Sequence, residues 1–133
     1  MDASLLILVL GTMTVTSYQP IPSQTKPECK NRYNCTTSID DGITQFGVAV
    51  SQDLLRSGAV KYGDMLDVPG FGLRTVNDCM GTTRCAKRNE AGKCIKRVPQ
   101  LNAIDLMVFS YEEERAVGVR RLPITRYRQR KLQ

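Results

Sequence analysis

The sequence predicts a mainly β protein of one domain. Its 133 residues provide for one hydrophobic core and little beyond it. Short apolar runs, ten glycines and six prolines are typical of many brief strands joined by turns, and they argue against a helical bundle. We therefore expect a mainly β fold with one or two short helices.

The first eleven residues (1–11) form an apolar N-terminal segment. Its unbroken run from Leu5 to Leu10 is far shorter than the roughly 18 residues of a membrane-spanning helix, so we expect no stable membrane span. The run is typical either of an atypical export signal, since Asp2 follows Met1 and no basic residue precedes the run, or of a first buried strand. The sequence leaves both interpretations open.

Two strands, a long loop and a short helix follow. Residues 12–18 alternate between apolar and polar side chains, as a half-buried strand does. Residues 23–42 are polar and rich in turn residues, which predicts a loop. Residues 46–50 form the next strand, and Ser51 is typical of an N-cap before a helix over residues 52–56.

The middle of the chain predicts a pair of strands and a basic insertion. Residues 64–68 alternate, Pro69 and Gly70 mark a tight turn, and residues 73–76 return as a second strand. Residues 82–100 then form an insertion, which we expect to be a loop or a hairpin held by its cysteines. The basic residues of this insertion are Arg84, Lys87, Arg88, Lys93, Lys96 and Arg97.

A helix, a final strand and a basic tail complete the chain. Residues 110–116 predict a short helix, because acidic side chains fill its first turn, where they suit the helix dipole. Residues 117–124 return as the last strand. The basic tail, residues 126–133, is expected to fray.

Five cysteines in so short a chain indicate an oxidising, extracytoplasmic compartment. We expect Cys29 to pair with Cys35, because both lie in the polar loop and close a short ring. Cys85 and Cys94 bracket a second short ring, which leaves Cys79 unpaired, although the sequence does not exclude other pairings. With no histidine and no Cys-x-x-Cys spacing, no metal or other cofactor is expected.

The chain carries a formal net charge of +6 and has a sequence pI near 9.2. This balance favours an anionic partner, which could be a nucleic acid, a membrane surface or a bacterial cell-wall polymer. Charge alone does not choose among these partners.

Two aspartates interrupt apolar segments that read as strands, and they are the first candidates for a site. Asp78 ends the run that begins at Leu73, and Asp105 stands in the middle of Ala103 to Met107. An ionised carboxylate in such a segment is costly unless a partner or a chemical role compensates for its burial. The structural alternative is that each aspartate ties a turn or loop through backbone N–H groups.

The order of these segments resembles the three-aspartate (3D) domain, a six-stranded double-psi β-barrel of bacterial and phage proteins that act on peptidoglycan. The resemblance covers Met13 to Ile124 and implies a barrel domain over residues 12–125, with residues 82–100 as an insertion. Its marks are Val15-Thr16-Ser17-Tyr18, Gly47-Val48-Ala49-Val50, Val68-Pro69-Gly70-Phe71-Gly72, Val76-Asn77-Asp78-Cys79-Met80, Ala103-Ile104-Asp105-Leu106 and Ala116-Val117-Gly118-Val119.

The resemblance also implies an activity. In the similar lytic transglycosylases of the membrane-bound type A family, a carboxyl group matching Asp105 protonates the glycosidic oxygen and then accepts a proton from the sugar's 6-hydroxyl. Asp78, on an adjacent strand, would raise the pKa of Asp105 by repulsion. The implied partner is the glycan strand of peptidoglycan, and the implied protein is a monomer that is secreted, periplasmic or virion-associated.

Three further residues are substrate-binding candidates. Asp53 is a shifted match to the family's first aspartate, which usually follows the Val-Ala-Val strand directly, and it also suits an exposed first helical turn. Lys96 follows Ile95 as the family's loop lysine does, although a solvated basic loop explains it as well. Tyr18 suits the core, or the wall of a sugar groove by stacking.

Two functions from other classes remain as alternatives. The related rare lipoprotein A and expansin-like proteins imply a wall-binding module that kept the barrel without catalysis. A nucleic-acid-binding role is suggested by the basic insertion and tail, but the sequence lacks aromatic residues interleaved with the basic ones. We therefore expect no specific nucleic-acid partner.

Overall fold

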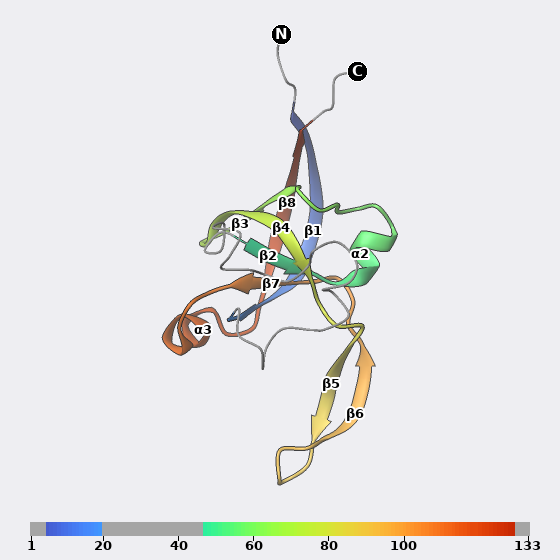
Figure 1. The fold of residues 1–133 in the computed structure, drawn as a ribbon, viewed down its shortest axis with the longest axis vertical. Helices are drawn as coiled ribbons and strands as arrows, with labels where there is room; N and C mark the ends of the chain where they lie inside the picture. Colours follow the sequence, from blue (N-terminus) through green and yellow to red (C-terminus); the bar gives the residue numbers. More distant parts are fainter. Residues whose placement is uncertain (1–4, 20–46, 130–133) are drawn as a thin grey trace.

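The computed structural model describes residues 5–19 and 47–129, and these form a closed barrel of six strands with a separate two-stranded ribbon (Figure 1). The order around the barrel is β1-β7-β2-β4-β3-β8. The pairs β1–β7 and β2–β4 are parallel, whereas the other neighbours are antiparallel. The barrel strands are β1 (Leu5–Tyr18), β2 (Gly47–Val50), β3 (Met65–Val68), β4 (Gly72–Cys79), β7 (Ala103–Met107) and β8 (Arg120–Gln129). The mainly β prediction is confirmed, and this mixed order is compatible with a double-psi barrel.

The described residues contain two short helices, as expected. In α3 (Tyr111–Val117), the side chain of Ser110 accepts a hydrogen bond from the Glu113 backbone N–H, which satisfies one free donor of the first turn. Ser51 precedes α2 (Gln52–Arg56) with an extended backbone, but its side chain makes no capping bond. Its hydroxyl instead accepts from the Ala103 N–H at 3.0 Å and ties α2 to the start of β7.

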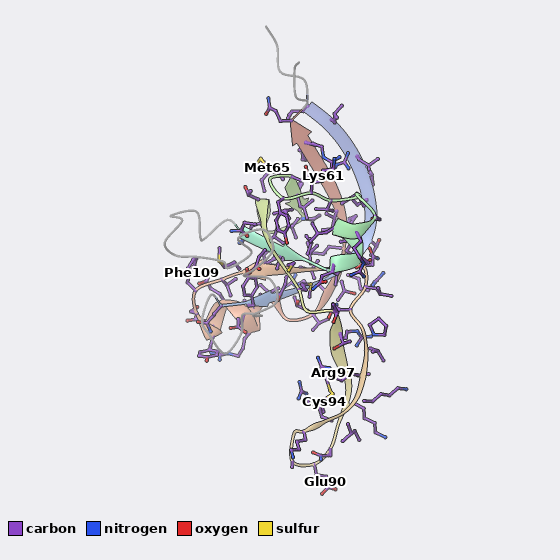
Figure 2. All side chains as sticks on the ribbon, turned by 45° about the vertical axis from the view of Figure 1, so that its right-hand side comes forward. Lys61, Met65, Glu90, Cys94, Arg97 and Phe109 are labelled. Carbon is purple, nitrogen blue, oxygen red and sulfur yellow. A yellow bond between two sulfur atoms is a disulfide. The ribbon has the colours of Figure 1, made fainter. Side chains whose placement is uncertain are left out.

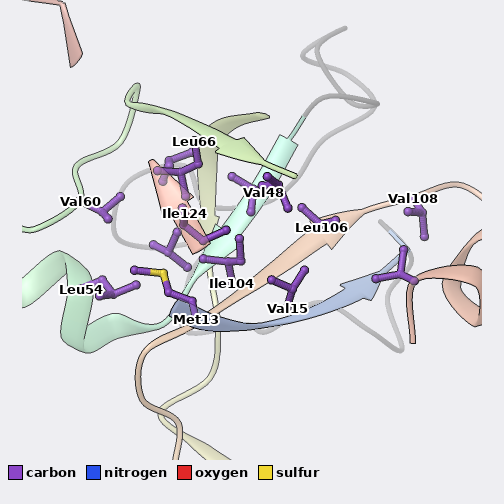
Figure 3. Packing of buried hydrophobic residues seen from close by; sticks show 14 residues of the cluster. Met13, Val15, Val48, Leu54, Val60, Leu66, Ile104, Leu106, Val108 and Ile124 are labelled. Atoms are coloured by element: carbon purple, nitrogen blue, oxygen red, sulfur yellow. The ribbon is translucent and has the colours of Figure 1, made fainter. Parts of the chain in front are cut away.

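Alternating side chains of the strands fill the barrel interior (Figure 3). Val15, Val48 and Ile104 are fully buried on neighbouring strands, and the residue that follows each of them on its strand faces away from this interior. The interior cluster consists of Met13, Val15, Val48, Val50, Leu54, Val60, Leu66, Val68, Val76, Ile104, Leu106, Val108, Val117 and Ile124. This alternation decides which polar side chains reach the outer face of the barrel.

The apolar run at the N-terminus is part of β1 but is not buried. Leu5 to Val9 pair antiparallel with Thr125 to Gln129 of β8, and the two strands rise together toward the chain ends (Figure 1). Side chains in this run are exposed, including Ile7 at 61% and Val9 at 71%. The run is thus a first strand, as one of the two interpretations held, but the expectation that it is buried is wrong, because this part of β1 lies beyond the packed core. The export-signal interpretation stays a prediction.

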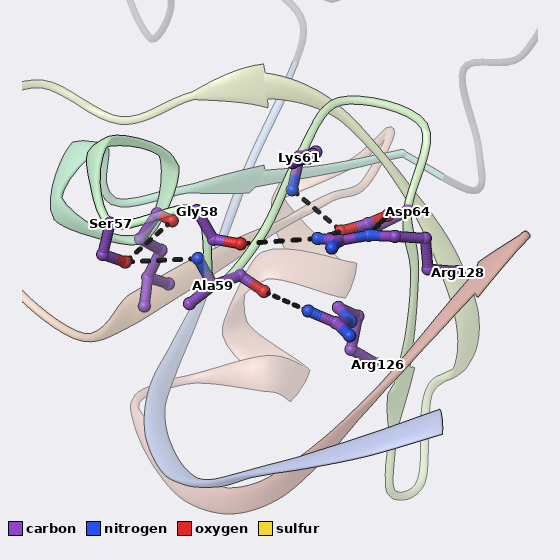
Figure 4. A network of polar contacts seen from close by, with 8 residues as sticks. Ser57, Gly58, Ala59, Lys61, Asp64, Arg126 and Arg128 are labelled. Atoms are coloured by element: carbon purple, nitrogen blue, oxygen red, sulfur yellow. Dashed lines mark hydrogen bonds and ion pairs between the residues drawn. The ribbon is translucent and has the colours of Figure 1, made fainter. Parts of the chain in front are cut away.

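The expectation that the tail frays is wrong for residues 126–129, which belong to β8. Arg128 makes an ion pair with the buried Asp64 at 2.7 Å, and the Lys61 backbone N–H donates to the same carboxylate at 2.8 Å (Figure 4). Arg126 is buried and donates to the Ala59 carbonyl at 2.9 Å. The basic residues are thus held by the loop between α2 and β3, and residues 130–133 lie outside the described residues.

We expect Arg128→Ala to lower the free energy of unfolding by about 2–3 kcal/mol, because it leaves the buried Asp64 carboxylate without its cationic partner. Urea denaturation at pH 7 measures this change. The matched control is Arg121→Ala, since the exposed Arg121 bonds the Thr14 hydroxyl at the surface, and its expected effect is within about 0.5 kcal/mol. Equal losses in the two variants would contradict a stabilising role for the ion pair.

The basic insertion is a hairpin. Its strands β5 (Thr83–Arg88) and β6 (Cys94–Pro99) pair with each other and project away from the barrel (Figure 1). The expected Cys85–Cys94 disulfide joins them. Cys79 is itself disulfide-bonded, so the expectation that it is unpaired is wrong.

Several expectations fall on residues that the structure does not describe. The loop over residues 23–42, the Cys29–Cys35 pair and the start of the second strand at Phe46 all lie outside the described residues. In the described part of the chain, no helix is long and apolar enough to cross a membrane.

Candidate active site

Four side chains lie in one row across neighbouring strands of the barrel. Thr16 of β1 is in register with Asp105 of β7, Asp105 is in register with Ala49 of β2, and Ala49 is in register with Asp78 of β4. Register partners on adjacent strands project from the same face of a sheet. The row faces outward, because residues that flank Thr16, Ala49 and Asp105 on their strands fill the core.

A bulge in β4 brings Asp78 into this row. Val48 pairs with Val76, but the next residue of β2, Ala49, pairs with Asp78, so Asn77 is the extra residue on β4. Strict alternation after the buried Val76 would place Asp78 inside the barrel. The bulge shifts the register by one residue and turns the Asp78 carboxylate to the outer face.

Asp78 is buried and held on both carboxylate oxygens. The Tyr18 hydroxyl donates to Oδ2 at 2.9 Å, and the Cys79 backbone N–H donates to Oδ1 at 2.8 Å. Two donors from different strands fix the orientation of the carboxylate and compensate for much of its lost hydration.

Asp105 has a strongly perturbed pKa. The pKa of its carboxyl group is raised from 3.8 to about 7, chiefly by desolvation, while a hydrogen bond from the Thr16 hydroxyl to Oδ1 at 2.8 Å opposes part of the increase. The negative charges of Asp78 and Glu114 contribute smaller parts of this increase. Near neutral pH this carboxyl group therefore populates both the acid and the carboxylate form, as a general acid and base must.

Helix α3 contributes a third carboxylate near the row. The Gln19 side-chain amide donates to Glu114 Oε1 at 2.8 Å, and the Ser17 hydroxyl donates to the Glu114 carbonyl at 3.5 Å. These bonds hold the helix against the end of β1. Nothing in the sequence marks Glu114 as a site residue, because its position in an acidic first turn is already explained by the helix dipole.

Thr16 was also not identified as a site residue. The only signal available for it was the alternation of β1, which places it on the face opposite Val15. A threonine on the outer face of a strand is ordinary, and its partner became evident only from the parallel pairing of β1 with β7.

The predicted site residues divide into two groups. Asp105, Asp78 and Tyr18 are brought together on the outer face of the barrel. Asp53 lies on α2 and accepts a hydrogen bond from the Asn102 backbone N–H at 3.1 Å, which ties the helix to the residue before β7. Lys96 is exposed on β6, within the ribbon rather than beside the carboxylates.

Small and apolar residues surround the carboxylates. Tyr18, Ala49 and Met107 form a buried cluster, and Met80 packs against it. Ala49 separates Asp105 from Asp78 in the row. Apolar neighbours remove water from this face, which agrees with the raised pKa of Asp105.

Gly47 is needed for close packing next to this row. A Cβ atom at this position would lie 2.7 Å from Asn77 Oδ1 and 2.7 Å from Met107 Cε. Asn77 is the bulge residue, and its Oδ1 is buried with no hydrogen-bond partner among the described residues. The absence of a side chain at Gly47 therefore accommodates the bulge that positions Asp78.

We expect Gly47→Ala to lower the free energy of unfolding by about 1–3 kcal/mol, because the new methyl group overpacks the bulge. Combining it with Asn77→Ala should recover part of the loss, since the second change removes the amide that the methyl group contacts and leaves the contact with Met107. Urea denaturation of both single variants and the double variant gives the coupling. Strictly additive losses would show that the two side chains do not compete for the same space.

Among residues 5–19 and 47–129, no cluster of three or more histidine, cysteine, aspartate or glutamate side chains could hold a metal ion. No family model matches the chain, and no curated protein matches it significantly. The resemblance to the three-aspartate domain rests on the quoted sequence segments and on a compatible barrel.

Proposed function

We propose that this protein is a peptidoglycan lytic transglycosylase in which Asp105 is the catalytic acid and base. The observation that carries the proposal is the Asp105 carboxyl group, which is desolvated, held by Thr16, close to the negative charge of Asp78, and has a pKa raised to about 7. A group that exchanges its proton near neutral pH suits a reaction that needs an acid and then a base at one position.

The proposed reaction needs no water. Asp105 donates its proton to the bridging oxygen as the bond from this oxygen to the anomeric carbon of the sugar breaks. The resulting Asp105 carboxylate then accepts the proton of the same sugar's 6-hydroxyl, whose oxygen bonds to the anomeric carbon and closes a 1,6-anhydro ring. The group ends in the protonated form in which it began, and this differs from glycosidases that divide the two roles between two carboxylates.

In this scheme Asp78 is a positioning residue. Its two hydrogen bonds, from the Tyr18 hydroxyl and the Cys79 N–H, keep its charge in place beside Asp105. That charge favours the protonated form of Asp105 before the reaction. The same charge stabilises positive character that develops on the sugar as the glycosidic bond breaks.

The wider properties of the chain agree with a wall substrate. The Cys85–Cys94 disulfide suits an oxidising, extracytoplasmic location, and the net charge of +6 suits the acidic polymers of a bacterial wall.

Tyr18 acts in the site through its hydroxyl, which donates to Asp78, while its ring belongs to the buried apolar cluster.

The test is incubation of the purified chain with peptidoglycan sacculi, followed by mass analysis of the soluble fraction. A lytic transglycosylase releases fragments that end in 1,6-anhydro sugars, each lighter by one water than the product of a hydrolase. A known muramidase serves as the hydrolytic control. Soluble fragments with only reducing ends would overturn the transglycosylase assignment.

A wall-binding module without catalysis is the second candidate. It is favoured by the full hydrogen bonding of Asp78, since both of its oxygens are engaged by the protein, as in a structural tie. This candidate predicts that the chain sediments with sacculi but releases no soluble fragment at any pH between 5 and 8.

A further inference from the structure

The ribbon formed by β5 and β6 concentrates positive charge away from the barrel. Between Thr83 and Pro99 it carries six basic residues and one acidic residue, Glu90, which lies near its tip (Figure 2). The side chains of this ribbon are largely exposed. The ion pair found in the described part of the chain joins Arg128 to Asp64, and both of these residues belong to the barrel and not to the ribbon. The charge of the ribbon is therefore open to solvent and to a partner.

Two lysines face each other across the ribbon. Lys87 of β5 and Lys96 of β6 are Cα partners at a point where the register of the ribbon shifts on both sides, and both are exposed. Directly opposed residues of an antiparallel pair have Cβ atoms about 4.5–5.5 Å apart, and like charges at such positions are destabilising. A two-stranded ribbon has little stability of its own, so this repulsion is unfavourable unless an anion relieves it.

The arginines of the ribbon are engaged differently. Arg97 donates to the hydroxyl and carbonyl of Thr83, and Arg88 donates to the Gly92 carbonyl at 3.0 Å. No described residue accepts a hydrogen bond from the ammonium group of Lys87 or of Lys96. These two groups thus retain their donors for an external acceptor.

The cross-link keeps the lysines in this arrangement. The Cys85–Cys94 disulfide joins the two strands within two residues of each lysine, so the backbone positions that carry the two side chains stay close together. Fixed attachment points reduce the conformational freedom that is lost when both ammonium groups bind one multivalent anion.

We propose that Lys87 and Lys96 form a binding site for the phosphate groups of a phosphodiester polymer of the cell wall, which anchors the protein close to its glycan substrate. The choice of a wall polymer rests on the proposed function, whereas the preference for phosphate rests on the paired ammonium groups. The ribbon contains no aromatic residue on which a base could stack, which disfavours a single-stranded nucleic acid.

The experiment measures binding of the full chain to sacculi by sedimentation over a range of salt concentrations. All proteins carry Asp105→Asn, so that binding is measured without cleavage of the sacculi. Lys87→Gln combined with Lys96→Gln should weaken binding about tenfold and reduce the slope of log affinity against log salt by about two. The matched control is Arg56→Gln with Lys61→Gln, which removes the same charge from exposed positions near the barrel and should leave binding within about twofold.

Two further arms identify the anion. Removing phosphodiester polymers from the sacculi with cold hydrofluoric acid should abolish the difference between the lysine variant and its control. Soluble polyphosphate should compete for the ribbon more effectively than a single-stranded oligonucleotide of equal phosphate content. Lys87→Arg with Lys96→Arg keeps the charges and should restore binding, which separates a loss of charge from a loss of folding.

Three results would overturn the proposal: equal binding by the lysine variant and its control, unchanged binding after hydrofluoric acid treatment, or stronger competition by the oligonucleotide. These results are independent of the proposed enzymatic activity, which is read from 1,6-anhydro fragments released by the chain with Asp105 intact. A failure of anchoring and a failure of catalysis are thus distinguished.

Discussion

Asp105→Asn is expected to lower the rate of 1,6-anhydro fragment release from sacculi by about 10³-fold, because it removes the proton that the leaving oxygen needs. The substitution preserves the shape of the side chain. The Thr16 hydroxyl, now 2.8 Å from Oδ1, can still donate to the amide oxygen. The loss of rate would therefore come from chemistry and not from a change in the strands that carry the row.

The pH dependence of the intact protein provides a second readout of this prediction. Because the pKa of Asp105 is raised to about 7, the acid form is depleted above that pH, and the rate of fragment release should fall there. Asp67→Asn is the matched control, since it makes the same change on β3, outside the row. An Asp105→Asn variant that releases fragments at the normal rate would remove Asp105 from the reaction.

Asp105→Asn is also expected to stabilise the folded protein above pH 7. The folded state binds the Asp105 proton more tightly than the unfolded state, since its pKa is about 7 when folded and 3.8 in the reference state. Between these values the folded state holds more protons, so the stability of the intact protein falls as the pH rises from about 4 to about 7. Asparagine cannot ionise, and the variant escapes this loss.

The expected gain follows from the size of the shift. The pKa increase is about 3, and each pKa unit corresponds to about 1.4 kcal/mol. The free energy of unfolding of the variant minus that of the intact protein should therefore rise by about 4 kcal/mol between pH 3.5 and pH 8. Urea denaturation at both pH values measures the two differences. A difference between variant and intact protein that does not change with pH would show that the Asp105 carboxylate is not destabilised by its surroundings.

Slower fragment release and a higher free energy of unfolding above pH 7 in Asp105→Asn would together show that this carboxyl group lowers stability while it serves the reaction. A buried carboxyl group that lowers stability at neutral pH is a candidate for a chemical role, since its perturbed pKa suits proton transfer. The stability effect of Asp105→Asn follows from burial under either candidate function, so the loss of fragment release is the result that distinguishes the transglycosylase from the wall-binding module.

Local patterns along the chain were sufficient to predict much of this fold. The alternation of residues 12–18 and 64–68 predicted strands, and the acidic turn after Ser110 predicted α3. The short spacing of Cys85 and Cys94 predicted their disulfide. These features depend on residues that are close in sequence. The alternation of side chains predicts the strands, the capping residue predicts the helix, and the short disulfide ring predicts the cysteine pair.

Long-range pairing explains the expectations that were wrong. The start of β1 and the end of β8 extend beyond the core because Leu5 to Val9 pair with Thr125 to Gln129. The sequence of neither segment indicates this pairing by itself. Arg126 and Arg128 resembled a solvated tail because the carbonyl and carboxylate that bind them come from residues 59 and 64. The bonding of Cys79 likewise depends on tertiary structure.

Composition and local pattern were enough to specify short strands, two helices, a cross-linked basic insertion and two aspartates in unfavourable surroundings. The meeting of those aspartates required closure of the barrel, which places β2 between β4 and β7 and aligns Ala49 with both carboxylates. It also required the extra residue at Asn77, because a strict two-residue period would have turned Asp78 inward. A residue's neighbours in sequence set its local conformation, but register between distant strands decides which charges desolvate and repel one another.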